Sequence, residues 1–387
     1  MVSIPPSDEF SENPSVAPSD PTGQSDVLRI LDANANRAAE GLRVVEEYLR
    51  FALDDAHLTA LCKSLRHELA DAVSAIPLLA RHAARDSDGD VGSPAASTVD
   101  SQQRLGASDV VAASMQRVQQ ALRVLEEYGK LLDVPATEAA VGSLPLSPAE
   151  TFERLRYRLY SLERAVTLTD DGLRRIPGPA LCVILDGCAS PGALARVAKS
   201  LIAVGVHMLQ LRDKTLPDRR LVERARILRQ LTRGTDTLFV VNDRADIARA
   251  ASADGVHMGQ DDVSVRDARR VVGPHALVGV STHSLDQAKQ AVIDGASYIG
   301  VGPVFPSTTK PQERLAGIEL LREVARNIRL PAFAISGITA GNVAQVLECG
   351  VSRIAVSSAV AGADDPADAA RLLLDLLSAK PQANRTP

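Results

Sequence analysis

The chain has 387 residues, of which 45% are hydrophobic and 24% are charged, so it can bury substantial cores and its length predicts two or three domains. Its net charge of −5 argues against broad binding to nucleic acid or to a membrane surface. The four cysteines, Cys62, Cys182, Cys188 and Cys349, show no C-x-x-C spacing, which argues against a zinc site or a disulfide framework and favours buried reduced thiols.

Residues 1–25 are rich in serine, proline and acidic side chains, a composition that predicts a disordered tail. Neither this segment nor any later one has an uninterrupted apolar run long enough for a signal peptide or a membrane span. We therefore expect a cytoplasmic protein that binds neither membranes nor nucleic acid, with a second short tail at 381–387.

Residues 26–170 have apolar side chains at helical spacing and contain an internal repeat. The segment 36–48 matches 116–128 at both arginines, the leucine, the first valine, both glutamates and the tyrosine. A further helix is predicted after each copy, at 58–74 and at 148–168. We therefore predict an all-α domain in which two related helical units form a bundle.

Residues 177–380 change to an alternation of predicted strands and helices. Eight short runs rich in β-branched residues predict strands at 181–185, 206–211, 238–241, 255–258, 277–280, 298–301, 332–335 and 353–356. Amphipathic stretches between them predict helices, among them 216–231, 286–294, 318–327 and 339–349.

Eight alternating strands within about 200 residues fit an α/β fold, a compact (β/α)₈ TIM barrel, in this C-terminal half. A doubly wound open sheet is the competing fold. That fold normally places a glycine-rich dinucleotide loop after its first strand, and residues 186–189 do not form one. The barrel is therefore the prediction, preceded by the all-α helical-bundle domain.

Polar and charged residues follow several of the predicted strands. Arg212 and Lys214 come after the second strand and offer fixed positive charge for phosphate oxygens. Asn242 and Asp243 follow the third strand, and the acidic pair at 261–262 follows the fourth. Because the carboxyl ends of barrel strands form one rim, these groups should meet there. Carboxylates beside cations suit Mg²⁺ that bridges a diphosphate.

The later strand ends carry hydroxyl groups, glycine and one more cation. Residues 307–310 read Ser-Thr-Thr-Lys after the sixth strand, 336–337 read Ser-Gly after the seventh and 357–358 read Ser-Ser after the eighth. Loops seven and eight of such barrels often bind phosphate through backbone N–H groups. The sequence therefore predicts a site for two phosphorylated groups, one bound with metal and one without.

The strand-end motifs together closely resemble the thiamine-phosphate synthase family, from about residue 181 to the C-terminal helix. The matching segments are QLRDK at 210–214, NDR at 242–244, GVHMGQDD at 255–262, GVSTH at 279–283, YIGVGPVF at 298–305, TK at 309–310 and ISGI at 335–338. Enzymes of that family join hydroxymethylpyrimidine diphosphate to a thiazole phosphate, or to its carboxylated form, and release diphosphate. The resemblance implies one Mg²⁺ per barrel site.

The resemblance also assigns roles to individual residues. It assigns the pyrimidine diphosphate to Gln210, Leu211, Arg212, Asp213, Lys214, Asn242, Ser281 and Lys310. It assigns Mg²⁺ to Asp243 and Asp262. It assigns the thiazole phosphate to Ser307, Thr308, Thr309, Gly337, Ser357 and Ser358. Here the family's usual Gly-Gly after strand seven reads Ser336-Gly337, and a serine replaces the aliphatic residue that commonly precedes the last serine.

The implied chemistry needs charge stabilisation more than proton transfer. The diphosphate can leave before attack if Mg²⁺, Arg212, Lys214 and Lys310 neutralise it, and the thiazole nitrogen then captures the pyrimidylmethyl cation. Arg212, Lys214, Ser281 and Lys310 are the expected catalytic residues. Capture requires positioning rather than a general base, so we expect packing or loop-ordering roles for His257 and His283.

The helical half resembles a domain fused to some members of that family, which is linked to phosphorylation of hydroxymethylpyrimidine phosphate. On this hypothesis Arg85, Asp86 and Asp90 bind the phosphates of a magnesium nucleotide, and the alternative is a structural or dimerising role. For the barrel, the alternatives are a thiazole tautomerase and a ligand-binding regulator, against which the retained diphosphate and metal residues argue. The sequence leaves open whether the chains form a homo-oligomer.

Overall fold

The computed structural model describes residues 23–86, 104–132, 147–307 and 315–379. Both predicted tails therefore lie almost wholly outside the described residues, as do Asp90, Thr308, Thr309 and Lys310. The chain divides into two compact units, one from 1–41, 67–105 and 116–156 and the other from 42–66, 106–115 and 157–387. No helix of the described residues is both long enough and apolar enough to cross a membrane.

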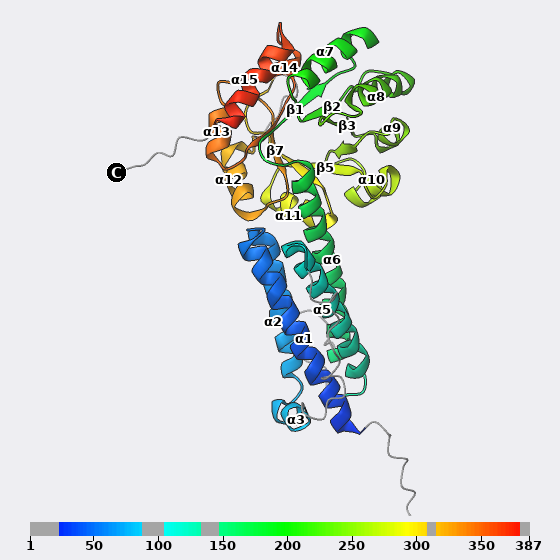
Figure 1. Cartoon of the computed structure of the whole chain (residues 1–387), viewed down its shortest axis with the longest axis vertical. Helices are drawn as coiled ribbons and strands as arrows, with labels where there is room; N and C mark the ends of the chain where they lie inside the picture. Colours follow the sequence, from blue (N-terminus) through cyan, green and yellow to red (C-terminus); the bar gives the residue numbers. More distant parts are fainter. Residues whose placement is uncertain (1–22, 87–103, 133–146, 308–314, 380–387) are drawn as a thin grey trace, which may run out of the picture. The chain divides into compact units, whose positions relative to one another are not determined.

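The N-terminal half is helical, as its spacing predicts. Its helices are α1 (Gln24–Phe51), α2 (Ala56–Ser74), α3 (Leu78–Ala83), α5 (Ala107–Gly129) and α6 (Pro148–Arg175). The two copies of the sequence repeat fall in α1 and α5 (Figure 1). Apolar residues three or four positions apart supply each helix with a buried stripe, among them Leu42, Val45 and Leu49 on α1 and Leu155, Leu159 and Leu162 on α6.

The repeat has a structural explanation in two buried ion pairs. Glu46 on α1 accepts a hydrogen bond from Arg66 Nε on α2 at 2.8 Å. Glu126, its counterpart on α5, accepts one from Arg156 Nε on α6 at 2.7 Å. Both glutamates are only 5% exposed. Each copy of the repeat therefore uses the same carboxylate to bind an arginine of the helix that follows it.

The C-terminal half is a closed barrel of eight parallel strands in sequence order, which confirms the predicted fold. The strands are β1 (Ala180–Leu185), β2 (Met208–Leu211), β3 (Leu238–Asn242), β4 (Gly255–Met258), β5 (Leu277–Thr282), β6 (Tyr298–Val301), β7 (Ala332–Ile335) and β8 (Arg353–Val356). All eight coincide with a predicted strand, and their boundaries differ by at most one or two residues.

Helices follow the strands and lie around the barrel (Figure 1). They are α7 (Pro191–Ala203), α8 (Asp218–Thr232), α9 (Ala245–Ala250), α10 (Val265–Val272), α11 (Leu285–Asp294), α12 (Gly317–Asn327), α13 (Val343–Glu348), α14 (Ser358–Ala361) and α15 (Pro366–Ser378). Serine side chains cap three of them, because Ser190, Ser264 and Ser284 each accept a hydrogen bond from a first-turn N–H.

One predicted helix begins later than its sequence pattern indicates. The pattern predicts a helix over 339–349, but α13 begins at Val343. The Asn342 side chain accepts a hydrogen bond from Thr339 N at 2.8 Å and donates one to Gly337 O at 2.9 Å. This local bonding holds 339–342 in a turn, and asparagine commonly competes with helical hydrogen bonds in this way.

Large side chains fill the interior of the barrel. Its core includes Met208, Val240, Leu277, Tyr298 and Phe333, all less than 3% exposed. In the parallel register of β5 and β6, Gly279 stands opposite Tyr298. A Cβ atom at position 279 would come within 2.1 Å of the tyrosine ring, so only glycine leaves room for this ring inside the barrel.

Candidate active site

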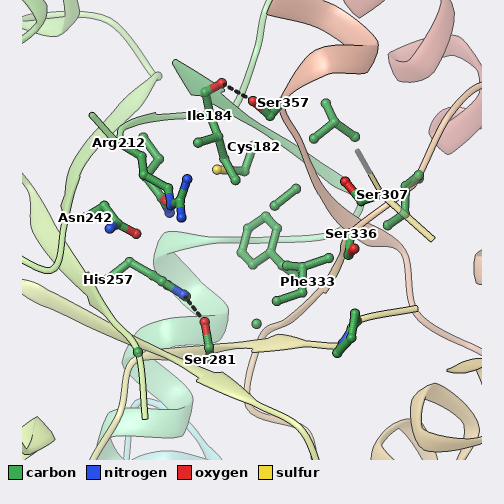
Figure 2. Close-up of a pocket in the computed structure, with 18 of the residues that line it drawn as sticks. Cys182, Ile184, Arg212, Asn242, His257, Ser281, Ser307, Phe333, Ser336 and Ser357 are labelled. Carbon is green, nitrogen blue, oxygen red and sulfur yellow. Dashed lines mark hydrogen bonds between the residues drawn. The ribbon is translucent and has the colours of Figure 1, made fainter. Parts of the chain in front are cut away.

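A cavity of about 800 Å³ opens at the carboxyl ends of the barrel strands. Side chains from both early and late strands of the barrel line it (Figure 2). Among the predicted site residues that line it are Gln210, Arg212, Lys214, Asn242, Asp243, Asp262, Ser281, Ser307, Gly337, Ser357 and Ser358. The barrel topology therefore brings into one cavity residues that are separated by almost 150 positions in the chain (358 − 210 = 148).

Leu211 and Asp213, which belong to the same predicted set, do not line the cavity. Leu211 is 1% exposed and packs away from it, because neighbouring strand residues point to opposite faces. The Asp213 carboxylate instead accepts hydrogen bonds from the backbone N–H groups of Gly187, Thr215 and Leu216 at 2.8–2.9 Å. These hydrogen bonds hold the loop after β2 in place.

Two carboxylates and a lysine form the most strongly polar part of the cavity. Lys214 Nζ lies 3.3 Å from Asp243 Oδ2. Burial raises the pKa of Asp243, the neighbouring Asp262 raises it further, and Lys214 opposes the rise. Two adjacent carboxylates with one lysine repel each other, and a divalent cation between them would relieve that repulsion.

The backbone around these carboxylates is held in place. Asp243 adopts a left-handed conformation with φ of 62°, and its N–H donates to His257 O at 2.8 Å. Asp262 accepts a hydrogen bond from Gly259 N at 2.6 Å. Among the described residues no group of three or more His, Cys, Asp or Glu side chains could hold a metal. Two carboxylates, Asp243 and Asp262, are the kind of oxygen ligands that suit Mg²⁺, which binds to few protein carboxylates and to phosphate and water.

Another side of the cavity is built from hydroxyl groups and tight turns. Ser307, Ser336 and Ser357 lie there, away from Arg212 and Asn242 (Figure 2). Ser336 Oγ donates to Phe305 O at 3.1 Å and Ser357 Oγ donates to Ile184 O at 3.2 Å. The serine side chains make this side of the cavity polar without adding charge to it.

The turn after β7 explains the residues that the sequence has there. Ser336 and Gly337 both have positive φ, 77° and 67°. A Cβ atom at position 337 would come within 2.3 Å of Pro306 O, so glycine is required at this position. Ser336 keeps the left-handed conformation that a glycine would adopt more easily, and its hydroxyl hydrogen bond to Phe305 O helps to hold it.

Several lining residues were absent from the predicted set. His257 lies in the cavity wall, with Nε2 2.9 Å from Ser281 Oγ and Nδ1 3.2 Å from the Tyr298 hydroxyl. Burial lowers the pKa of His257 to about 4. His283 Nδ1 lies 2.5 Å from Gly302 O, which ties the loop after β5 to the loop after β6. Strand alternation could have found His257, because Val256 before it packs outward.

Comparison with known proteins gives these residues a family. Residues 181–360 match the family model described as thiamine monophosphate synthase, and residues 29–165 match the model of the ThiD2 family. The chain is 43% identical over 350 residues to a thiamine-phosphate synthase of Rhodopirellula baltica, an alignment that covers 87% of this chain and 89% of the relative. It is 40% identical over 352 residues to the thiamine-phosphate synthase of Thermosynechococcus vestitus, with 90% and 95% covered.

A solved structure of a thiamine phosphate pyrophosphorylase from Pyrococcus furiosus matches 51% of this chain and 95% of its own, at 38% identity and a TM-score of 0.47. Relatives such as those from Rhodopirellula and Thermosynechococcus, which match over most of their length, establish the family. The chain belongs to the thiamine-phosphate synthases, and it is a transferase of thiamine biosynthesis.

Proposed function

We propose that the barrel cavity binds hydroxymethylpyrimidine diphosphate beside a thiazole phosphate and joins the two with release of diphosphate. The observation that carries this proposal is the presence of two unlike walls in one cavity of about 800 Å³. Arg212, Lys214, Asp243 and Asp262 line the charged wall, and the serines and turns at 336–337 and 357–358 line the neutral one. A diphosphate with its metal suits the charged wall, and a monophosphate suits the neutral one.

The charged wall supports binding of one Mg²⁺ by Asp243 and Asp262. Burial and the neighbouring Asp262 raise the pKa of Asp243, so a cation bound by both carboxylates would be stabilised by their charge. When bound, the metal would supply positive charge to the departing diphosphate. Arg212 and Lys214, and Lys310 on the expectation from sequence, add fixed positive charge to the same leaving group.

In the proposed reaction the bond between the pyrimidylmethyl carbon and the diphosphate oxygen breaks first. The bonding electrons leave with the diphosphate, and the cation that remains takes the lone pair of the thiazole nitrogen to form the new carbon–nitrogen bond. No proton is transferred in either step. The protein therefore needs to hold the two substrates in line more than it needs a general base.

The floor of the cavity supports a cationic intermediate because part of it is apolar. Cys182, Ile184, Phe333 and Ile335 line it. Phe333 is 2% exposed and packs edge-on against Tyr298, with ring centroids 5.6 Å apart. An apolar floor keeps water away from the pyrimidylmethyl carbon, which water would otherwise capture in place of the thiazole.

Diphosphate release by the full chain tests the proposal. We expect release only when both substrates and Mg²⁺ are present, and a fall on the order of 100-fold in Asp243→Asn because one of the two metal ligands is lost. Asp246→Asn is the matched control, because Asp246 pairs with Arg244 through Nη2 at 2.7 Å and does not line the cavity. Equal activity of the two variants would contradict the metal site.

The same charged wall favours this chemistry over the two rivals for the barrel. A thiazole tautomerase needs no diphosphate wall, and a ligand-binding regulator needs no metal carboxylates. Isomerisation of the thiazole without pyrimidine diphosphate would support the tautomerase, and binding without turnover would support the regulator.

The four cysteines are free, which supports a reducing compartment such as the cytoplasm as the place of action.

For the helical half we propose phosphorylation of hydroxymethylpyrimidine phosphate, which would supply the substrate of the barrel. The match of residues 29–165 to the ThiD2 family and an arginine cluster support this proposal. Arg81 Nη1 and Arg85 Nη2 lie 3.1 and 3.2 Å from Asp32 Oδ1, and Asp32 is 2% exposed. The Arg85 side chain is 44% exposed, so its planar guanidinium is accessible to a nucleotide phosphate. Asp86 lies 3.8 Å from Arg29.

The Asp243→Asn chain separates this activity from the barrel reaction, because it should consume little of the diphosphate. Given ATP, Mg²⁺ and hydroxymethylpyrimidine phosphate, it should accumulate the pyrimidine diphosphate, and a further Arg85→Ala change should abolish the accumulation. If no diphosphate forms, the helical half has a structural or dimerising role.

A further inference from the structure

A chain of three polar side chains runs from the barrel core to the cavity. The Tyr298 hydroxyl on β6 lies 3.2 Å from His257 Nδ1 on β4, and His257 Nε2 lies 2.9 Å from Ser281 Oγ on β5. Figure 2 shows the bond between His257 and Ser281 at the edge of the cavity. Tyr298 and His257 are 2% and 8% exposed, whereas Ser281 is partly exposed and lines the cavity.

Packing fixes the buried end of this chain. The Tyr298 ring occupies the space left by Gly279 and packs against Phe333 at 5.6 Å between centroids. Among the described residues, His257 is the one hydrogen-bond partner of the Tyr298 hydroxyl. The hydroxyl is buried with His257 as its partner, and this bond decides which nitrogen of the imidazole carries the proton.

Only one proton arrangement satisfies all three groups. The Tyr298 hydrogen needs an acceptor, and among the described residues Nδ1 of His257 is the one that the hydroxyl reaches. If Nδ1 donated to Tyr298, the buried tyrosine hydrogen would have no acceptor, which is costly. If Tyr298 donates to Nδ1, Nε2–H donates to Ser281 Oγ, and every buried group has a partner.

We propose that Tyr298 and His257 are positioning residues that make the Ser281 hydroxyl a hydrogen-bond donor to a ring nitrogen of the aminopyrimidine. Because Ser281 Oγ accepts from Nε2–H, its own hydrogen is free to point into the cavity. A ring nitrogen with a lone pair is the acceptor that such a hydroxyl recognises. This inference rests on the proposed binding of the pyrimidine at Ser281, and it adds a reason for selecting a nitrogen heterocycle over a carbocyclic ring.

The first experiment determines the tautomer without any substrate. Nitrogen NMR of the full chain labelled at histidine, with the His257 signals assigned from a His257→Gln variant, should show a protonated Nε2 and an unprotonated Nδ1. A His257 that carries its proton on Nδ1 would overturn the relay from Tyr298.

The second experiment measures whether Tyr298 acts through Ser281. Tyr298→Phe keeps the ring in the core and removes only the hydroxyl. We expect the KM for the pyrimidine diphosphate to rise about 3- to 10-fold, the effect of one neutral hydrogen bond, with the KM for the thiazole phosphate nearly unchanged. In a Ser281→Ala background the same change should cause no further loss. Additive losses would overturn the proposal, because a purely structural effect of Tyr298 does not depend on Ser281.

Thr282→Val is the matched control for loss of a buried hydroxyl. Thr282 is 0% exposed, its Oγ1 donates to Gly300 O at 3.0 Å, and it does not line the cavity. Its KM values should match those of the wild type. If Ser281→Ala itself leaves the KM for the pyrimidine diphosphate unchanged, the substrate contact fails, whereas the NMR result still reports on the relay. The KM of Ser281→Ala therefore tests the proposed pyrimidine contact, and the NMR measurement separately tests the positioning by Tyr298 and His257.

Discussion

The helical half and the barrel both place carboxylates beside basic side chains, but the ratio of negative to positive charges differs between them. On the helices, Glu126 receives hydrogen bonds from Arg123 and Arg156 at 2.7 Å each and is 5% exposed. In the barrel, Asp243 and Asp262 lie together with Lys214 at 3.3 Å from Asp243. Cations satisfy the helical carboxylate, whereas the barrel pair carries excess negative charge.

This difference teaches which acidic clusters indicate function. A carboxylate whose charge is balanced inside the fold contributes to folding and has little left to offer a ligand. A pair that repels itself is tolerated because something outside the chain, here a proposed metal and diphosphate, completes it. In the sequence, acidic residues near basic ones look alike in both cases. The number of basic partners that each carboxylate has in the folded chain distinguishes a structural cluster from a functional one.

The largest expected effect is on the stability of the helical half. Glu126→Ala removes the buried carboxylate that binds Arg156, and we expect a loss of about 3 kcal/mol in the free energy of unfolding. Urea unfolding followed by helical circular dichroism measures it. Glu127→Ala is the neighbouring control, because Glu127 binds the exposed Arg123 and Lys130 at 2.8 and 2.9 Å and its side chain is 42% exposed. A similar loss in both variants would remove the distinction between the two regions.

The opposite response is expected in the barrel. Asp243→Asn removes one charge of the repelling pair, so the free energy of unfolding should stay the same or rise, by up to about 1 kcal/mol, although diphosphate release falls. Thermal unfolding without ligands measures the change in stability, and unfolding with Mg²⁺ and diphosphate measures the stability that each chain gains from binding them. The wild-type chain should gain stability from the added ligands and the variant should gain much less. A variant that unfolds well below the wild type without ligands would identify Asp243 as a structural residue.

Sequence patterns predicted the barrel and many of the cavity-lining residues for a physical reason. Strands have a local period, and the carboxyl ends of parallel strands fall on the same rim, so the positions of Arg212 and Asn242 needed no knowledge of packing. Ser281 was predicted from the family resemblance. Two residues of the match at 210–214, Leu211 and Asp213, do not line the cavity.

The remaining features depend on contacts between distant segments. The bonds of His257 to Tyr298 and Ser281 require the register of three strands, and no local pattern encodes it. The buried partner of Glu126 is 30 residues away on another helix. The late start of α13 reflects one asparagine side chain that overrides helical periodicity.

Asp213 gives the smallest effect and a third kind of carboxylate, one that backbone N–H groups satisfy instead of cations. Burial by itself raises the pKa of Asp213, but hydrogen bonds from Thr215, Gly187 and Leu216 lower it to about 2, below the ordinary value of 3.8. A lowered folded-state pKa stabilises the fold above pH 3.8, and this contribution is lost as the pH falls towards 2. Because the loop is partly exposed, we expect about 1 kcal/mol.

Asp213→Asn should therefore destabilise the barrel at neutral pH and make its stability less dependent on pH between about 4 and 2. Urea unfolding at a series of pH values measures the difference between the two chains, which should shrink as the pH falls because protonation of Asp213 makes the wild type resemble the variant. If the difference stays constant across this range, the carboxylate charge is not what holds the loop after β2. Diphosphate release at neutral pH should fall far less than in Asp243→Asn, because Asp213 is satisfied within the fold and Asp243 is not.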